Sequence, residues 1–429
     1  MKKILVSAGL AAIGAAGLHA DEYAPDVTAM DASRVWSVSG TLRGFYDSNY
    51  TTTPQSQYSW GFEVSPSISI IIPLQQTELG LRYTYGLYYY QARENQGANP
   101  IDQTQNVNLW IDHAFTERWE GKVQDVFNYG QEPQLSATGG LPYRVQSSYL
   151  QNIGTLSLHT EWSALFSTDL SYNNTLLQYE DNQGNISDPS LAGFLNQLDN
   201  GAFLNLNYQY LPDLSFLVGY QFTFNQYTAG QQIGYGQTPS DIYNSDSLNN
   251  YSQNFYLGGK YNANRNLDAN VQIGATYVDN YNLPSFSTQS STAWYPYANI
   301  ALTYTYLPGS YAQLGFTEDV GASDTPNPDH SNGSITTYQL TSVVYGTINH
   351  KFTPHLTGSV IGRYQYGIYE GGASDGDGQA WYSLGLNLSY SLNEYLSLDG
   401  GWNYDYVATT SALPGYHRNV TYLGITATY

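Results

Sequence analysis

Apolar and polar residues alternate at every second position through most of this chain. In the final segment, Leu423, Ile425 and Ala427 are separated by Gly424 and Thr426. Because successive residues of a β-strand point to opposite faces, such a segment has one apolar face and one polar face. An apolar outer face and a polar inner face are typical of a transmembrane β-barrel, and this is the fold that the pattern predicts.

Two kinds of connection join the alternating segments. One kind is a short turn with Pro, Asn, Asp or Gly, and we expect such turns near residues 73–76, 116–120, 162–167, 211–214, 263–266, 307–310, 352–355 and 392–395. The other kind is a polar loop, expected near residues 47–58, 92–104, 131–146, 181–200, 229–250, 280–292, 323–334, 370–379 and 408–417. The order predicts an all-β, antiparallel up-and-down barrel of about eighteen strands (roughly sixteen to twenty), with short periplasmic turns and long extracellular loops.

Two prolines interrupt the alternating pattern. Pro66 and Pro296 each lie inside a candidate strand. Because proline cannot donate a backbone hydrogen bond, we expect β-bulges or strand ends at these two positions.

The N-terminus has a different character from the rest of the chain. It begins with two lysines and an apolar run that extends to Leu18, which predicts a secretory signal peptide over residues 1–20. Residues 21–33 show no alternation and are predicted to form a periplasmic lead-in, so that residues 34–429 form the outer-membrane barrel. No later segment approaches the roughly 18 consecutive apolar residues that a membrane helix needs.

The composition agrees with a surface that faces lipid. Only 11% of the residues are charged, whereas 43 are Tyr, 41 are Gly and none is Cys. A soluble surface would carry about 25–35% charged residues, while aromatic girdles are typical of membrane barrels. The mean hydropathy of −0.39 fits a barrel with polar loops and a polar lumen. The formal net charge of −21 excludes nucleic acid as a partner.

The closing stretch, residues 413–429, and the repeated Tyr-x-Tyr, turn, Leu-x-x-x-Gly hairpins carry a family resemblance. In spacing and alternation, residues 34–429 resemble the family called OmpL-like "putative" β-barrel porins, or type 2. The resemblance implies a Gram-negative outer-membrane barrel with a pore, and it supplies no catalytic or ligand-binding residues. Members of such families often end in Phe. Here Tyr429 stands in that place, as the aromatic signal for the barrel assembly machinery.

Several charged residues fall in the inward phase of the predicted strands. A ring of such charges would select permeant solutes by charge, as pore constrictions do. The alternative is that any charge in these strands must face inward, because charge facing lipid costs roughly 2–4 kcal/mol near the midplane. The candidate pore-lining residues are Arg43, Arg82, Lys260, Arg363, Arg418, Glu63, Asp112, Asp399 and Asp405.

Candidate chemistry other than a pore is sparse. Residues 372–376 match Gly-x-Ser-x-Gly, but no helix follows them, so this is not the nucleophile elbow of a hydrolase. Acidic loop residues, namely Glu370, Asp375 and Asp377 in one loop and Glu318, Asp319, Asp324 and Asp329 near another, could bind Ca²⁺ or simply be solvated. No His or Cys cluster suggests a resident metal or other cofactor. We therefore expect no enzymatic activity.

Together these observations predict an outer-membrane porin that passes small hydrophilic solutes by diffusion, with a moderate preference for cations because the chain is acidic. The alternative is a plugged barrel that acts as a surface adhesin or structural protein. Inward aromatic residues such as Tyr90 and Trp381 could stack on sugar rings, which would suit carbohydrate permeation. Inward glycines such as Gly80 and Gly219 are expected to leave room in the lumen. The partners expected are outer-membrane lipids and the permeant solutes, and the sequence does not determine the oligomeric state.

Overall fold

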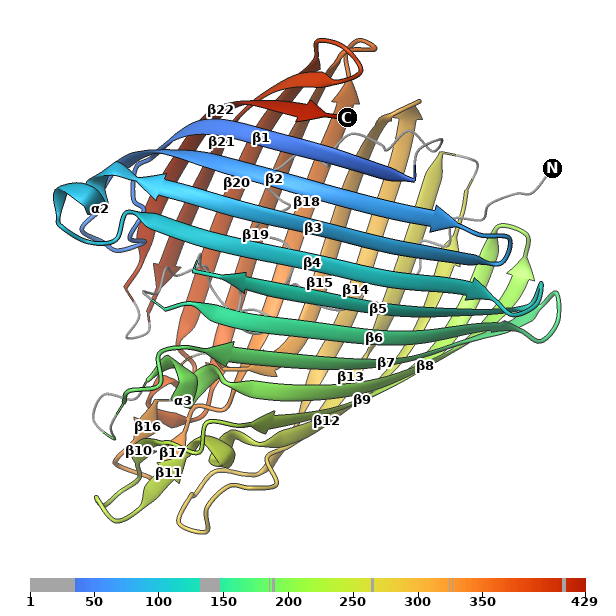
Figure 1. Ribbon diagram of the computed structural model, residues 1–429. Coiled ribbons are helices and arrows are strands. Elements are labelled where there is room, and N and C mark those ends of the chain that lie inside the picture. The colour runs from blue at the N-terminus through green and yellow to red at the C-terminus, as the bar shows by residue number, and fades with distance from the viewer. Residues whose placement is uncertain are drawn as a thin grey trace.

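The computed structural model describes residues 35–131, 147–184, 186, 190–263, 266–323, 325, 327–410 and 414–429. The predicted signal peptide and lead-in lie outside these residues. The described chain forms one 18-stranded antiparallel sheet, shown from the side in Figure 1, where the strands of the near wall cross those of the far wall. No helix among the described residues is long and apolar enough to span a membrane.

The strands of the barrel are 12 to 16 residues long. Their bounds are β1 (Trp36–Asp47), β2 (Ser59–Pro73), β3 (Thr77–Tyr90), β4 (Ile101–Ala114), β5 (Trp119–Gly130), β6 (Tyr149–Glu161), β7 (Phe166–Tyr179), β8 (Gln197–Leu211), β9 (Leu214–Tyr227), β12 (Asn250–Tyr261), β13 (Leu267–Asp279), β14 (Thr292–Leu307), β15 (Ser310–Ala322), β18 (Tyr338–Lys351), β19 (Leu356–Glu370), β20 (Gly378–Ser391), β21 (Leu396–Thr409) and β22 (Tyr416–Thr428).

Each strand pairs with its neighbours in sequence, and the sheet closes where β1 pairs with β22. The predicted all-β up-and-down barrel and its strand number are therefore confirmed. The short turns fall at one end of the barrel and the long loops at the other, as outer-membrane barrels require. The final hydrogen bonds of the closure join Val38 and Tyr429, whose backbone groups bond to each other in both directions.

The expectation about the two prolines was wrong. Pro66 lies inside β2 opposite Gly40, and Pro296 lies inside β14 opposite Ala275, without a register shift at either position. Each proline instead lies where one ladder is absent. The β2–β3 ladder omits Ser65 and Pro66, and the β14–β15 ladder begins only at Ala298. A missing N–H is tolerated there because the strand is paired on its other side.

The long loops carry the remaining elements. These are α2 (Gln91–Asn95), α3 (Leu191–Leu195), β10 (Gln232–Tyr235), β11 (Ile242–Asn244), η2 (Ser245–Leu248), β16 (Pro328–Asp329), β17 (Ser334–Ile335) and η3 (Gly372–Ser374). Figure 1 places β10, β11, β16 and β17 together at the end of the barrel opposite to the short turns. Ile233, Tyr243, Leu248 and Ile335 form a buried apolar cluster there with Tyr227 from the end of β9. These loops therefore have a small core of their own.

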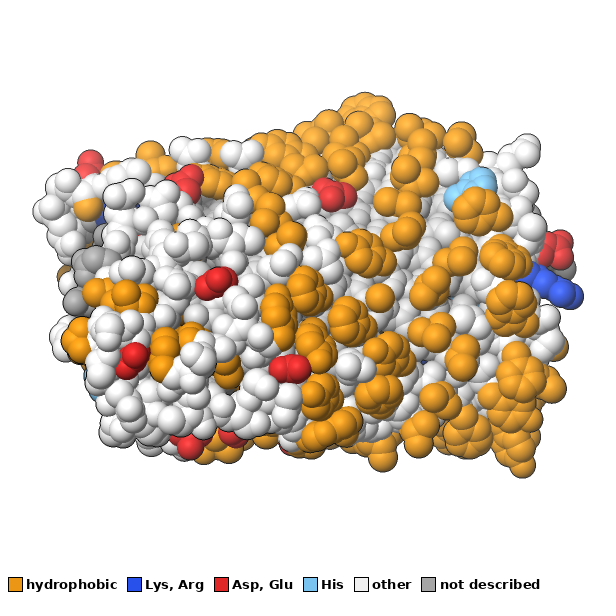
Figure 2. All heavy atoms as spheres, turned by 90° about the horizontal axis from the view of Figure 1, so that it is seen from below, with side chains coloured by type: hydrophobic (Ala, Val, Ile, Leu, Met, Phe, Trp, Pro, Cys, Tyr) orange, Lys and Arg blue, Asp and Glu red, His pale blue; other side chains and the backbone are white. Residues whose placement is uncertain are grey.

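The outer face of the barrel is apolar over its short-turn half. Leu423 is 71% exposed and Ile425 is 38% exposed, whereas Tyr422, between Thr421 and Leu423, is buried at 8%. The predicted phase of the last strand is thus confirmed. Figure 2 shows hydrophobic side chains gathered in a band over one half of the visible face, while the other half carries scattered Asp and Glu. This band is the part that faces lipid, so the polar phase of each strand lines the interior.

Candidate pore wall

A cluster of opposite charges lies inside the barrel where the sheet closes. Arg43 in β1 donates from Nε to Asp399 Oδ2 at 3.1 Å and from Nη1 to Glu63 Oε2 at 3.4 Å. The guanidinium carbon lies 5.1 Å from the centre of the Tyr422 ring. The three charged side chains are between 4% and 12% exposed. Pairing is what allows these charges to be buried, since an isolated charge would be expensive in this place.

A second ion pair lies nearer the long loops at the same closure. Arg418 in β22 donates from Nη2 to Asp47 Oδ2 at 2.6 Å and from Nε to the same oxygen at 3.0 Å. The Asp47 side chain is only 1% exposed, and its other oxygen also accepts the backbone N–H of Asn49. Arg418 therefore holds the first and last strands together in addition to carrying a charge.

Arg363 lies against the wall formed by β19 to β21. Its Nη2 donates to Gln365 Oε1 at 2.8 Å, and its guanidinium carbon lies 4.9 Å from the Trp381 ring centre. The Trp381 indole in turn donates to Asp405 at 3.0 Å. Arg363 is 8% exposed and Trp381 is fully buried. This part of the inner wall is closely packed.

The remaining candidates lie on a more open part of the wall. Arg82 lies opposite Ser69 and Asn108, and it is half-buried. Asp112 lies 3.8 Å from Lys122, whose side chain is 45% exposed. Lys260, near the short-turn end of β12, is also half-buried. The nine predicted residues thus do not form one ring. The structure divides them between a closely packed sector of the wall and a more open sector. The packed sector contains Arg43, Glu63, Arg363, Asp399, Asp405 and Arg418, and the open sector contains Arg82, Asp112 and Lys260.

Other inner-wall residues with chemistry were not among the sequence-based candidates. His159 Nδ1 lies 2.6 Å from Asp169 Oδ1, and Asn207 donates to the other oxygen of Asp169 at 2.8 Å. The His159 side chain is 42% exposed. The period of two places Asp169 in the inward phase together with Ser167 and Ser171. The inward position of Asp169 could therefore be predicted from the sequence. Its contact with His159 in β6 could not, because that contact depends on the register of the two strands.

The inward glycines do not leave empty space, which corrects the expectation from the sequence. An added Cβ at Gly80 would lie 1.8 Å from the Trp110 ring, and one at Gly219 would lie 2.1 Å from the Tyr256 ring. Aromatic rings from neighbouring strands therefore occupy these positions and lie against the wall. Such ring-over-glycine pairs stabilise adjacent strands.

Two further expectations do not fit the structure. Tyr90 is 3% exposed and Trp381 is fully buried, so neither ring face is open to a passing sugar. Among the described residues, no group of three or more His, Asp or Glu side chains could hold a metal ion. This finding contradicts a Ca²⁺ site formed by Glu370, Asp375 and Asp377. Asp324 lies outside the described residues.

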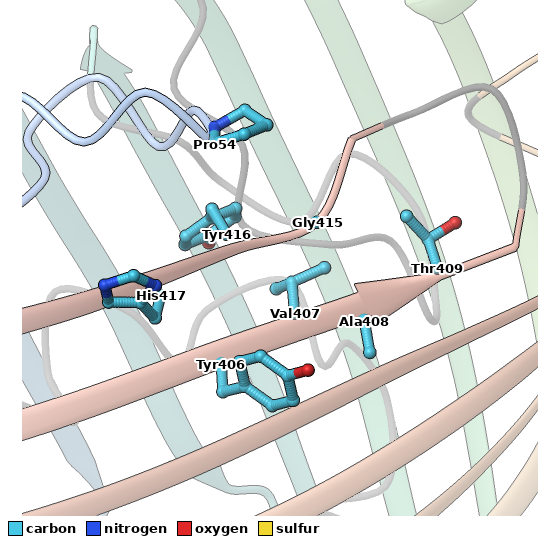
Figure 3. Close-up of a pocket in the computed structure, with 8 residues that line it drawn as sticks. All are labelled: Pro54, Tyr406, Val407, Ala408, Thr409, Gly415, Tyr416 and His417. Atoms are coloured by element: carbon cyan, nitrogen blue, oxygen red, sulfur yellow. The ribbon is translucent and has the colours of Figure 1, made fainter.

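A pocket of about 360 Å³ lies at the rim where β21 and β22 separate. Figure 3 shows that Tyr406, Val407, Tyr416 and His417 surround it from the two strand ends, with Pro54 from the loop between β1 and β2. Its lining has no Asp, Glu, Lys or Arg, so the pocket is separate from the charged pore wall.

The closed barrel, its apolar band and its polar interior define a porin-like β-barrel protein of the outer membrane. Residues 310–429 match the model of the family described as "Putative beta-barrel porin 2", which confirms the predicted resemblance over that part of the chain. Comparison with curated protein sequences finds no match.

Among solved structures, three from Pseudomonas aeruginosa are similar to this chain. The outer membrane protein OpdK has 10% identity and a TM-score of 0.47, covering 92% of this chain and 99% of that chain. OccK11 (OpdR) has 13% identity and a TM-score of 0.40, covering 92% and 95%. A variant of the ferric enterobactin receptor PfeA has 11% identity and a TM-score of 0.44, covering 91% and 80%.

Proposed function

We propose that this protein is a passive porin for small hydrophilic solutes, with a moderate preference for cations. The observation that carries the proposal is the excess of acidic over basic side chains in the inward phase of the strands. The acidic residues are Asp47, Glu63, Glu78, Asp102, Asp112, Glu120, Glu161, Asp169, Asp199, Asp268, Asp319, Asp399 and Asp405, and the basic residues are Arg43, Arg82, Lys122, Lys260, Lys351, Arg363 and Arg418.

Ion pairing leaves this excess unchanged, because each ion pair neutralises one carboxylate together with one cation. Arg43 is shared by two carboxylates, and Arg418 is held by Asp47. Paired cations contribute little to the potential in the lumen, whereas the surplus carboxylates lower it and favour cations. A barrel of 16–18 strands is wide enough to leave an aqueous channel. Each of the nine candidate residues would then contribute to the electrostatic potential of the lumen, and those in the open sector would contribute most.

The test is the reversal potential of single channels in a planar bilayer with a salt gradient. We expect moderate cation selectivity, and we expect Asp169→Asn to reduce it, because Asp169 lies on the open wall. Glu180→Gln is the matched control, since Glu180 accepts a bond from Tyr129 in the outward phase of β5. Anion selectivity of the unmodified protein would overturn the cation preference and leave the porin proposal standing.

The packed sector favours one alternative. Three residues on the inner face of this wide barrel are at most 1% exposed, namely Gln365, Gln379 and Trp381. A closed lumen would produce such burial, and the folded long loops would then serve as an adhesive or structural surface. Correctly folded protein that opens no channels in the bilayer experiment would support this alternative and contradict the porin proposal.

A further inference from the structure

A groove crosses the lipid-facing side of the barrel between β15 and β21. Its volume is about 330 Å³, and it extends over the positions Leu314, Gly346, Gly362 and Leu384. These residues lie opposite one another on four adjacent strands, so they form one continuous row. The two glycines at its centre lack side chains, whereas the leucines at both ends are 39% exposed or more. The groove is therefore a gap of two side chains in the apolar surface.

The gap is open, unlike the positions of the inward glycines. An added Cβ at Gly362 would meet no atom within 4 Å, and one at Gly346 would have its nearest contact at 3.5 Å. The next row toward the short turns, Ile348, Val360 and Leu386, is apolar throughout. Val344 and the tyrosines Tyr364, Tyr382 and Tyr404 complete the walls of the groove, and the inward residues Tyr345, Arg363 and Ser383 lie beneath it.

Hydroxyl groups lie at the other end of the groove. The next row toward the long loops contains Tyr364, Tyr382 and Tyr406. Their rings are packed in sequence, with centroids 4.8 Å and 5.9 Å apart. Each of the three is about 40% exposed, with values of 39%, 43% and 42%. Tyrosines at this level are typical of the membrane interface, where the ring faces the chains and the hydroxyl faces the head groups.

The charges around the groove restrict its occupant. In β15 and β18 to β21, the side chains of the basic residues Lys351 and Arg363 point into the barrel. Ile348 and Tyr364, on the same two strands, point to the lipid-facing side. The outward Asp, Glu, Lys and Arg residues among the described residues of these strands are both acidic, namely Glu318 in β15 and Glu370 in β19. An anionic head group would therefore find no cation here, whereas a zwitterionic head group can bond to the tyrosine hydroxyls.

We propose that this groove is a specific binding site for a zwitterionic phospholipid, which places one acyl chain over Gly346 and Gly362. The phosphate and glycerol oxygens of its head group accept hydrogen bonds from the hydroxyls of Tyr364 and Tyr382, which line the groove. Continuity with the apolar band places the site in the lipid-facing surface, where an acyl chain is the adjoining molecule. Burial of methylene groups in the gap distinguishes this lipid from the others around the barrel.

The test is native mass spectrometry of the full-length protein, delipidated in detergent and titrated with phosphatidylethanolamine. We expect one lipid to be held more tightly than the rest. Gly362→Leu should weaken binding of that first lipid by about tenfold, because the leucine occupies the space of the chain. Gly44→Leu is the matched control, because Gly44 is an outward glycine that also has no atom within 4 Å of an added Cβ but lies outside the groove.

Heat-modifiable mobility in gels establishes that each variant is folded, and Gly346→Leu gives an independent variant of the same gap. Tyr382→Phe keeps the ring and removes a hydroxyl, so it should weaken phosphatidylethanolamine binding if the head group lies there. The proposal is overturned if the unmodified protein holds no lipid preferentially, or if the control weakens binding as much as Gly362→Leu does. Tighter binding of phosphatidylglycerol would overturn the zwitterionic assignment. If Gly362→Leu separates a dimer of this protein but leaves the first lipid bound, the groove is a contact with a second copy of the chain, and the lipid proposal is overturned.

Discussion

Arg418 in the last strand and Asp47 in the first strand form an ion pair across the closure of the barrel, with N–O distances of 2.6 Å and 3.0 Å. The Asp47 carboxylate is almost completely buried at 1% exposure. If one member of the pair is removed, the other remains as a buried charge, and nothing compensates for the hydration that it has lost. The pair therefore contributes to holding the closing strands together.

We expect Asp47→Ala and Arg418→Ala each to lower the free energy of unfolding by about 3 kcal/mol, because each change leaves a buried charge without its partner. The double variant should lose less than the sum of the two, since both remove one interaction. Urea titration followed by tryptophan fluorescence measures these values. Lys122→Ala is the control, and its half-exposed pair with Asp112 should be worth about 1 kcal/mol or less. Equal losses at both pairs would contradict this account.

The sequence predicted the barrel because the features that define it are local. The alternation around Ile425 and the short turn at Pro308 and Gly309 can be read from neighbouring residues alone. Partners in the site could not be predicted in this way. Arg43 contacts Asp399, which is 356 positions away, and that contact depends on barrel closure and on the register of three strands. Alternation showed that both residues face inward, but not that they face each other.

Accessibility within the lumen provides a second prediction. The chain has no Cys, so a single introduced Cys reports on one position. Arg82→Cys should react with a charged thiol reagent on the order of tenfold faster than Arg363→Cys, because reaction requires an exposed thiolate. Arg82 is half-buried on the open wall, whereas Arg363 is 8% exposed. Labelling at Arg82→Cys should also lower single-channel conductance if this residue lines a constriction.

The outcomes of this labelling experiment are distinct. Labelling at Arg82→Cys without a change in conductance would show that the residue faces water but does not line a constriction. Equal rates at the two positions would contradict the division into an open and a packed sector.

The phase of the last strand gives a third prediction. Ile425 faces lipid, whereas the Thr426 hydroxyl lies 2.9 Å from that of Thr41 inside the barrel. Ile425→Arg should therefore destabilise the inserted barrel by about 2–4 kcal/mol more than Thr426→Arg, since only the first change places a charge in hydrocarbon. The fraction of heat-modifiable protein in outer-membrane extracts measures assembly. Similar fractions for the two variants would mean that the inward and outward assignments in this strand are wrong.

The aromatic rings that lie over inward glycines give the last prediction. An added Cβ at Gly315 would lie 2.1 Å from the ring of Tyr345, which occupies the same row on the adjacent strand. Gly315→Ala should push this ring into the lumen, which lowers single-channel conductance and costs about 1–3 kcal/mol of stability as overpacking does. Gly44→Ala is the control, because an added Cβ there meets no atom within 4 Å. In a Tyr345→Ala background, Gly315→Ala should have little further effect, because the clash is already absent. If Gly315→Ala lowers conductance equally with and without the Tyr345 ring, that ring does not cover the glycine in the folded barrel.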